Sequence, residues 1–377
     1  MFRPACLAFL AAAVPISLYA QLTPARSPNP AADNISTANA ADDASSAAGA
    51  ATNSTDTPAE AAAQRAKSPT QQPAKPSKPS ADLPPIEGSM VGYIDNAVVG
   101  SQIRVRFDDA FGNNAPDRAE FFYAQCGCDG PGAHGPGPGL ATNLNFQQLY
   151  LRGEYAPLKR LSFIVDVPIR WLQPQSFDLN TVPAGQQPFG NQSGISDVQA
   201  GFKFALVGTQ RRYLTFQFMA SFPSGDSTRG LGTGHYSVAP SLLYFQRVTD
   251  RFSFEGEVGD THPTSSSGAA NFAGDVFMYG IGPSYELYHG ENLRFAPVVE
   301  LVGWHVLGGM ENNDAALIAS GYTNPFLNPD GINIVNLKAG FRTSIGHHQS
   351  FYAGFGQALT HDLWYKHIVR LEYRYTF

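Results

Sequence analysis

The last fourteen residues of the chain alternate between apolar and charged side chains with a period of two. One face carries aromatic and aliphatic side chains and the other carries charged ones: Tyr365, His367, Val369, Leu371, Tyr373, Tyr375 and Phe377 against Lys366, Arg370, Glu372 and Arg374. Only a β-strand sorts side chains in this way. An aromatic face opposite a charged face, on a strand that ends at the chain terminus, is typical of a strand with lipid on one side and water on the other.

Similar alternating runs follow one another from about residue 88 to the C-terminus. Their lengths suit the roughly nine to eleven tilted residues with which a strand crosses a membrane. We count about twelve runs: 100–107, 143–155, 160–171, 194–207, 212–223, 233–246, 251–260, 273–288, 293–306, 332–345, 349–360 and 364–377. The sequence therefore predicts an all-β fold, a transmembrane antiparallel up-and-down β-barrel of about twelve strands.

The connections between these runs alternate between tight and long. Tight turns are predicted near Pro157, Thr209, Thr249, Gly290 and His347, and long loops at 108–142, 172–193, 224–232, 261–272 and 307–331, with a shorter loop near His361. Barrels of the outer membrane have short periplasmic turns and longer external loops. If the first strand starts in the periplasm, every tight turn and the C-terminus fall on the periplasmic side.

The direction in which each face points distinguishes a membrane barrel from a soluble one. In the predicted third strand, Phe163, Val165 and Val167 share an apolar face, whereas Asp166 and Arg170 lie on the other. We assign the apolar faces to lipid, because they are long and carry aromatic residues at their ends. A water-soluble barrel with the faces reversed is the alternative.

Composition divides the chain into three parts. Residues 1–20 contain a basic residue, a short apolar run and a small residue at Ala20, which predicts a secretory signal peptide, with a short anchor helix as the alternative. Residues 21–87 are rich in Ala, Pro, Ser and Thr and predict a disordered periplasmic linker. Residues 88–377 hold the predicted barrel. The net charge of −6 gives the chain no general basic character, so we expect no nucleic-acid partner.

Several short motifs resemble one family of outer-membrane proteins, the MetA-pathway of phenol degradation family. These motifs are Gly194 to Lys203 (GISDVQAGFK), Phe222 to Asp226 (FPSGD), Gly230 to Gly234, the barrel start Ser101 to Asp108 (SQIRVRFD), and the Phe377 terminus. The resemblance covers roughly residues 95–377. It implies a barrel of about twelve strands in a Gram-negative outer membrane and the passage of small, often hydrophobic or aromatic compounds.

With the faces assigned, a set of charged side chains is predicted to line the lumen. The set is Arg104, Arg106, Arg152, Glu154, Asp166, Arg170, Lys203, Glu255, Glu257, Glu286, Arg294, Glu300, Lys338, Arg342, Lys366, Arg370, Glu372 and Arg374. Because the last strand must pair with the first, Arg370 and Arg374 are expected on one wall with Arg104 and Arg106, opposite Glu255, Glu257 and Glu286. Such walls would create a transverse field that orients a solute. The alternative is that these residues are ion pairs that fill a narrow lumen.

Two motifs suggest other chemistry. His235 and Ser237 have the spacing of the catalytic pair of outer-membrane phospholipases, but no asparagine follows at a matching position to orient the histidine. Cys126, Cys128 and His134 offer three metal ligands, which leaves a structural zinc site incomplete, and a strained disulfide between the cysteines is the other possibility. No cofactor is implied.

The function that we expect is a channel for passive uptake or efflux of small molecules. The alternatives are a structural or adhesive barrel with a blocked lumen, and an outer-membrane lipid hydrolase. The expected partners are outer-membrane lipid, a small-molecule solute, and the outer-membrane assembly machinery, which would bind the C-terminal strand.

Overall fold

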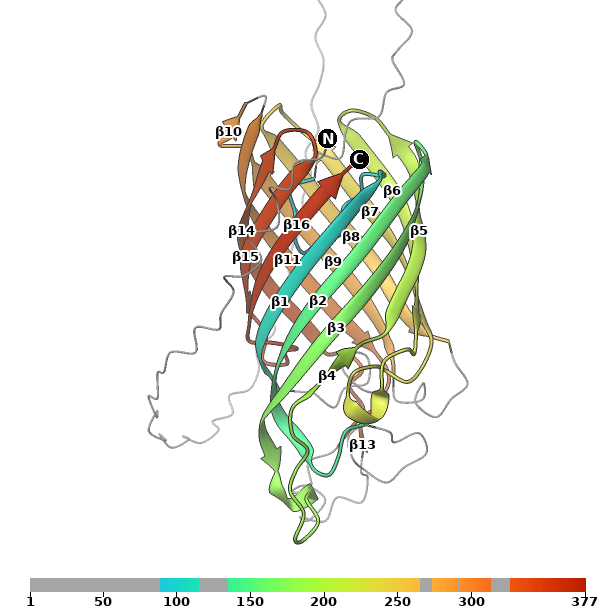
Figure 1. Ribbon diagram of the computed structural model, residues 1–377, viewed down its shortest axis with the longest axis vertical. Coiled ribbons are helices and arrows are strands. Elements are labelled where there is room, and N and C mark those ends of the chain that lie inside the picture. Colours follow the sequence, from blue (N-terminus) through green and yellow to red (C-terminus); the bar gives the residue numbers. More distant parts are fainter. Residues whose placement is uncertain (1–88, 115–134, 265–272, 291, 313–325) are drawn as a thin grey trace, which may run out of the picture. The chain divides into compact units, whose positions relative to one another are not determined.

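The computed structural model of the protein describes residues 89–114, 135–264, 273–290, 292–312 and 326–377 (Figure 1). All of these residues belong to one compact unit, Ala74–Phe377. The predicted signal peptide (1–20), the predicted linker (21–87), and Cys126, Cys128 and His134 lie outside the described residues. They stay predictions.

Within the described ranges, twelve antiparallel strands form one closed barrel. In order around the barrel they are β1 (Gln102–Asn113), β2 (Leu140–Leu158), β3 (Leu161–Asp178), β5 (Val198–Gly208), β6 (Arg212–Phe222), β7 (Ser237–Arg247), β8 (Phe252–Pro263), β9 (Asp275–Tyr285), β11 (Leu293–Leu307), β14 (Asn333–Ile345), β15 (Gln349–Ala358) and β16 (His367–Thr376). The last strand pairs with the first, with Arg104 opposite Arg374. The predicted fold class and strand number are confirmed.

Four short strands lie outside this circle. β4 (Gln192–Ile195) extends the wall beside β3, and β10 (Tyr288–His289) pairs with β11. β12 (Glu311–Asn312) and β13 (Phe326–Leu327) form a separate pair. The tight turns and the C-terminal residue lie at one end of the barrel, which we call the turn end, and the long connections lie at the other, the loop end (Figure 1).

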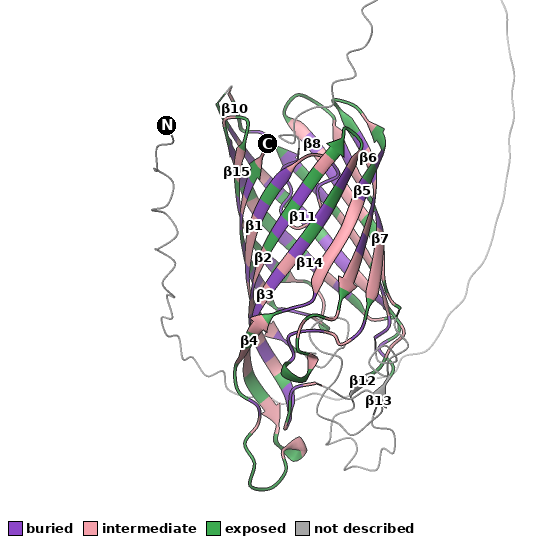
Figure 2. Cartoon of the chain, turned by 45° about the vertical axis from the view of Figure 1, so that its right-hand side comes forward, coloured by how far each residue is buried: buried purple, intermediate pink, exposed green. Residues whose placement is uncertain are grey.

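The apolar faces of the strands point outward. On β3, Phe163 and Val165 are 53% and 50% exposed, whereas Asp166 and Arg170 are 2% and 9% exposed. Bands of buried and exposed residues alternate along the strands in this way around the wall (Figure 2). This arrangement contradicts the soluble alternative, in which the charged faces would point outward. None of the helices among the described residues is long and apolar enough to span a membrane.

Strand ends at the loop end differ from the predicted ones. β1 continues to Asn113, β2 starts at Leu140 and β3 continues to Asp178, where the pattern predicts loops. The backbone ladder persists there, with Leu140 opposite Asp178. Beyond the membrane both faces of a strand contact water, so apolar and polar residues no longer need to alternate. The sequence pattern therefore ends before the hydrogen-bonded pairing of the strands does.

The predicted fourth strand is divided by a β-bulge. Ile195 pairs with Ile169 and Gln199 pairs with Asp166, so three residues of one strand lie opposite two of β3. The bulge turns Ser196 inward together with its neighbour Asp197, and both side chains are buried.

The segment before β1, residues 89–101, lies inside the barrel, and we call it the inner segment. Ser89 lies at the turn end beside His348, and the segment reaches Tyr93 and Asp95 before it returns to Ser101, whose carbonyl accepts a hydrogen bond from Phe377. No residue of this segment belongs to a strand. Its apolar residues fill two clusters: Met90, Val91 and Ile94 with Ala296, Val298, Val302 and Tyr352, and Ala97, Val98 and Val99 with Ala205, Tyr213, Leu243 and Phe245. The alternating pattern predicts no such segment.

Candidate functional site

Glu300 on β11 binds the tip of the inner segment. One carboxylate oxygen accepts a hydrogen bond from the backbone N–H of Gly92 (2.8 Å), and the other accepts from Tyr93 (2.8 Å) and Ile94 (2.9 Å). Glu300 is fully buried. One wall carboxylate therefore accepts the backbone hydrogen bonds of three successive residues. These N–H groups have no strand partner, because the inner segment is not part of the sheet.

The first residues of the segment are held by both signs of charge. Glu255 on β8 accepts a hydrogen bond from the N–H of Met90 at 2.9 Å. Arg342 on β14 donates to the carbonyl oxygens of Met90 (3.0 Å) and Val91 (2.7 Å). Arg370 on β16 donates to the carbonyl oxygen of the next residue, Gly92 (2.8 Å). Wall side chains thus replace the partners that a β-ladder would supply.

Asp95 connects the far side of the segment to other strands. Its carboxylate accepts from Arg152 on β2 (2.9 Å), Gln217 on β6 (3.0 Å) and Arg104 on β1 (3.4 Å). Its N–H donates to Glu257 on β8 (3.0 Å). Residues from strands all around the wall therefore bind the segment, which crosses the lumen at this level.

Many charged side chains of the wall, including some that bind the segment, form ion pairs with one another. Glu372 lies between three arginines, Arg342 (2.9 Å), Arg374 (3.0 Å) and Arg104 (3.6 Å). Other pairs are Arg370 with Asp108 (2.7 Å), Arg152 with Asp166 (2.8 Å) and Lys203 with Glu154 (3.3 Å). This arrangement favours the alternative of a lumen filled by ion pairs over separate basic and acidic walls, because an unpaired buried charge is costly.

The structure places nearly all of the predicted lumen residues inside the barrel wall or at its turn end. The side chains that are buried are Arg104, Arg152, Glu154, Asp166, Arg170, Lys203, Glu255, Glu286, Arg294, Glu300, Lys338, Arg342, Arg370, Glu372 and Arg374, and those that are half-buried are Arg106 and Glu257. Glu286 follows the end of β9, where it pairs with Arg294. It is therefore at the turn end and not on a wall facing the basic residues.

Lys366 was predicted to line the lumen, and this is wrong. Its side chain is exposed, whereas Tyr365, predicted to face lipid, is only 6% exposed. β16 begins at His367, and the N–H of Lys366 donates to the carbonyl of Phe111. The prediction applies the period of two to residues before the start of β16, where successive side chains no longer point to opposite faces.

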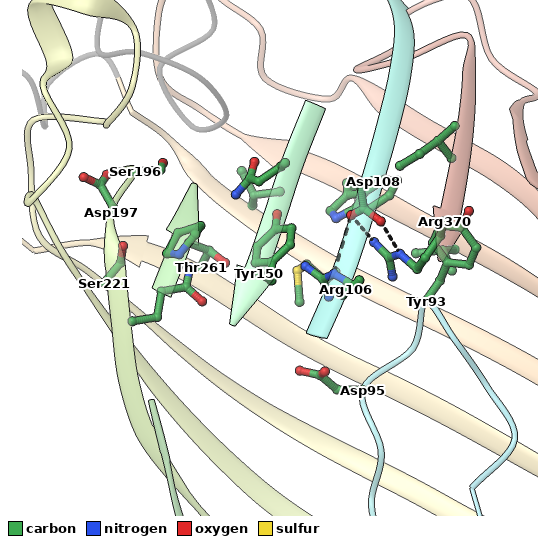
Figure 3. Close-up of a pocket in the computed structure, with 18 of the residues that line it drawn as sticks. Tyr93, Asp95, Arg106, Asp108, Tyr150, Ser196, Asp197, Ser221, Thr261 and Arg370 are labelled. Carbon is green, nitrogen blue, oxygen red and sulfur yellow. Dashed lines mark hydrogen bonds and ion pairs between the residues drawn. The ribbon is translucent and has the colours of Figure 1, made fainter. Parts of the chain in front are cut away.

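A cavity of about 360 Å³ lies between the inner segment and the loop end. Figure 3 shows Arg106 and Arg370 converging on Asp108, with Tyr93 of the inner segment beside them. The other lining residues include Asp95, Phe146, Gln148, Tyr150, Arg152, Arg170, Asp197, Thr233, Glu257, Met278, Trp304, Lys338 and Tyr365. The volume of this cavity falls in the range of small-molecule binding sites.

Asp108 and Tyr93 are among the residues of this site that are absent from the predicted set, as are Asp95 and Asp197. Asp108 was placed in a loop because the predicted first strand ended at residue 107. Continuing the period of two from Arg104 and Arg106 would have placed Asp108 on the same inward face. No pattern in the sequence marks Tyr93.

The loop-end connection 223–236 is fixed by Asp197. The carboxylate of Asp197 accepts from the N–H of Gly225 (3.0 Å) and from the N–H and hydroxyl of Thr233 (2.7 and 2.8 Å). The same connection places Leu231, which is 1% exposed, in an apolar cluster with Trp364. The bulge that turns Asp197 inward therefore anchors this connection over the barrel mouth.

His235 lies in this connection and not on a strand, since β7 begins at Ser237. The ring Nδ1 lies 3.1 Å from the carbonyl oxygen of Thr233, to which it donates. Burial lowers the pKa of His235. Among the described residues, no hydrogen bond joins His235 to Ser237, and no group of three His, Cys, Asp or Glu side chains has the arrangement of a metal site. The geometry gives the hydrolase alternative no support.

No family model and no curated protein matches the chain. Among solved structures, the chain is similar to the COG4313 outer membrane channel from Pseudomonas putida F1, with 14% identity, a TM-score of 0.47, and coverage of 74% of this chain and 96% of that chain. It is also similar to the beta domain of the Bordetella autotransporter BrkA (12% identity, TM-score 0.43, 74% and 100% covered) and to the KdgM porin in complex with disordered oligogalacturonate (9%, 0.36, 73% and 99%). Identities this low leave function to be argued from this chain's own geometry.

Proposed function

We propose that the protein is an outer-membrane channel for small solutes and that the inner segment closes its lumen. The observation that carries this proposal is the way in which the segment is held. Side-chain bonds and apolar contacts bind it, whereas the closed ladder of twelve strands is complete without it. The segment can therefore move without unpairing any strand of the barrel.

The lining of the lumen supports passage of a polar or charged solute once the segment moves. The buried surface of the barrel wall is rich in ionisable and amide side chains, such as Gln148, Lys203 and Gln217. A barrel that serves only as a membrane anchor can fill its interior with apolar side chains, which avoids the desolvation of so many polar groups.

The outward apolar face supports a location in the outer membrane of a Gram-negative bacterium. We also propose that residues 1–20 are a signal peptide, that residues 21–87 form a periplasmic linker, and that the assembly machinery binds β16. The family resemblance implies small hydrophobic or aromatic solutes, and we include these among the solutes that the channel would pass.

A structural or adhesive barrel is the second candidate. Its support is the inner segment itself, which crosses the lumen at the level of Glu300 among many ion pairs of the wall. The two functions differ in whether the inner segment moves.

A disulfide between the segment and the wall tests this difference. A Cβ atom at Gly280 would lie 3.0 Å from Cγ1 of Ile94, so cysteines at these positions are within reach of each other. Ile94→Cys with Gly280→Cys is made in a background in which Cys126 and Cys128 are serine, and single-channel currents are recorded in planar bilayers. We expect closed channels when the pair is oxidised and openings after reduction, whereas Ile94→Cys alone responds to neither treatment.

Currents that are equal in the oxidised and reduced states would show that the segment does not gate the pore. A correctly folded, reduced protein that never conducts would favour the structural barrel.

A further inference from the structure

The cavity beside the inner segment has more buried positive charge than its own carboxylates neutralise. Asp108 is shared by Arg370, at 2.7 Å, and Arg106, at 3.5 Å. The ring of Tyr93 lies between Arg370 and a third cation, Lys338. The guanidinium of Arg370 is 4.0 Å from the ring centre, and the ammonium of Lys338 is 3.8 Å from it. Three cations therefore surround one carboxylate at this wall (Figure 3 labels Tyr93, Arg106, Asp108 and Arg370).

Within the described part of the chain, Lys338 forms no ion pair with a carboxylate. Its ammonium donates one hydrogen bond, to the hydroxyl of Tyr365 at 2.8 Å, and otherwise lies against the rings of Tyr93 and Trp304. Its neighbour across the strands, Glu300, uses both oxygens for the amides of the inner segment. Among the described residues no carboxylate oxygen lies within 4.0 Å of the ammonium nitrogen of Lys338, and the residue is only 2% exposed.

The other carboxylates of the cavity are already bound. Asp95 pairs with Arg152. Asp197 accepts hydrogen bonds from Thr233 and Gly225 of the connection 223–236. Glu257 accepts the N–H of Asp95. An ammonium has three donors, and among the described residues Lys338 donates one hydrogen bond, so two donors remain for an acceptor that enters from the cavity.

Arg106 supplies a second group of the same kind. Its guanidinium lies over the ring of Tyr150, 3.6 Å from the ring centre, and its Nε faces the carboxylate of Asp108 at 3.5 Å, a carboxylate that it shares with the closer Arg370. A planar guanidinium that shares its only carboxylate among the described residues with another arginine suits a further carboxylate oxygen. The same cavity also has apolar lining from Phe146, Val276, Val302 and Ile368.

We propose that this cavity binds a small organic anion, whose carboxylate pairs with Lys338 and Arg106 and whose hydrocarbon part lies on the apolar lining. The anion supplies the charge that the wall lacks. This inference names the solute class of the proposed channel and rests on that function, although binding itself is measured without transport.

Titration calorimetry on the full-length protein in detergent tests the site. The probe is hexanoate, and 1-hexanol and hexylammonium are its neutral and cationic matches. We expect hexanoate to bind, and its dissociation constant to rise at least about tenfold in Lys338→Met, because a buried charge-assisted bond is lost. Lys338→Arg retains the positive charge and is expected to retain binding, and Lys366→Met, which removes an exposed lysine, serves as the matched control.

Several outcomes would overturn the site: no binding of hexanoate to a folded protein, equal binding of 1-hexanol, or equal loss in Lys366→Met and Lys338→Met. Loss of binding in Lys338→Arg as well as in Lys338→Met, in proteins with unaltered heat-modifiable migration, would also overturn it, since charge would then not be the cause. Binding without any conductance would refute the channel and leave the site intact, whereas conductance without binding would refute only the site.

Discussion

At the scale of single residues, Glu300 contributes most directly to the closed state. Its two oxygens accept three amide hydrogen bonds from the tip of the inner segment, in a fully buried position. Hydrogen bonds to a buried charged group are worth about 1.5–3 kcal/mol each. Removing the charge should therefore loosen the tip without altering the ladder of β11.

We expect Glu300→Gln to raise hydrogen exchange at residues 92–94 by roughly tenfold or more, because the carboxamide presents one acceptor where the carboxylate presents two. Exchange followed by mass spectrometry in detergent micelles measures this. Glu154→Gln is the matched control, since Glu154 is also buried but its partners among the described residues, such as Ser162 and Lys203, belong to the wall. Exchange that rises equally in both variants would indicate general loosening of the barrel.

The charged character of the lumen follows from the period of two, but the contacts of its residues do not. Alternation predicts which face carries Glu300 and Arg370, since it depends only on neighbours in one strand. Their partner Gly92 lies 208 and 278 residues away in sequence. A segment such as 89–101, which is neither alternating nor strongly polar, carries no local signal of its place inside a barrel.

At the scale of elements, β9 is shaped to receive the inner segment. Gly280 and Gly282 face the lumen beside Ile94 and Val91. A Cβ atom at Gly282 would lie 2.8 Å from Cγ1 of Val91 and 3.0 Å from Cγ of Glu300, which is closer than side chains normally pack. The absence of side chains at these positions makes room for the closed state.

Gly282→Val should displace the inner segment. Overpacking costs about 1–3 kcal/mol, so we expect the equilibrium between closed and open channels to shift toward open by roughly 5- to 150-fold. Open probability in planar bilayers measures the shift. Gly153→Val is the control, because a Cβ atom there would meet nothing within 4 Å. An unchanged open probability in Gly282→Val would mean that the segment accommodates the side chain in the closed state.

The strands could be predicted from the sequence because the membrane imposes the same alternation on each of them. The prediction failed where that constraint stops. Beyond the membrane, β3 continues to Asp178 by backbone pairing alone, and β7 begins only at Ser237 because the preceding connection turns inward at Leu231. The bulge beside Pro168 is likewise a local feature that alternation does not encode.

At the scale of the whole molecule, the barrel separates two environments with a single layer of residues. Leu151 and Leu371 are 42% and 49% exposed on the outside, whereas Arg152 and Glu372, their chain neighbours, are 7% and 3% exposed. In water this surface would aggregate, since a contiguous apolar band of this kind has no polar cover. In a bilayer it lowers the free energy of the folded state.

An arginine on the outer face should destabilise the barrel by an amount that depends on its depth in the membrane. Val165 lies near the middle of the apolar face of β3, between Leu161 and Trp171, and is 50% exposed. Val165→Arg should lower the free energy of unfolding from lipid vesicles by about 2–4 kcal/mol, the penalty for arginine at the bilayer midplane, whereas Leu158→Arg at the end of β2 should lower it by only about 0–1 kcal/mol. Urea titrations in vesicles measure both values. Equal and small penalties at the two positions would mean that the outer face does not contact hydrocarbon, and the assignment of the barrel to a membrane would fail with it.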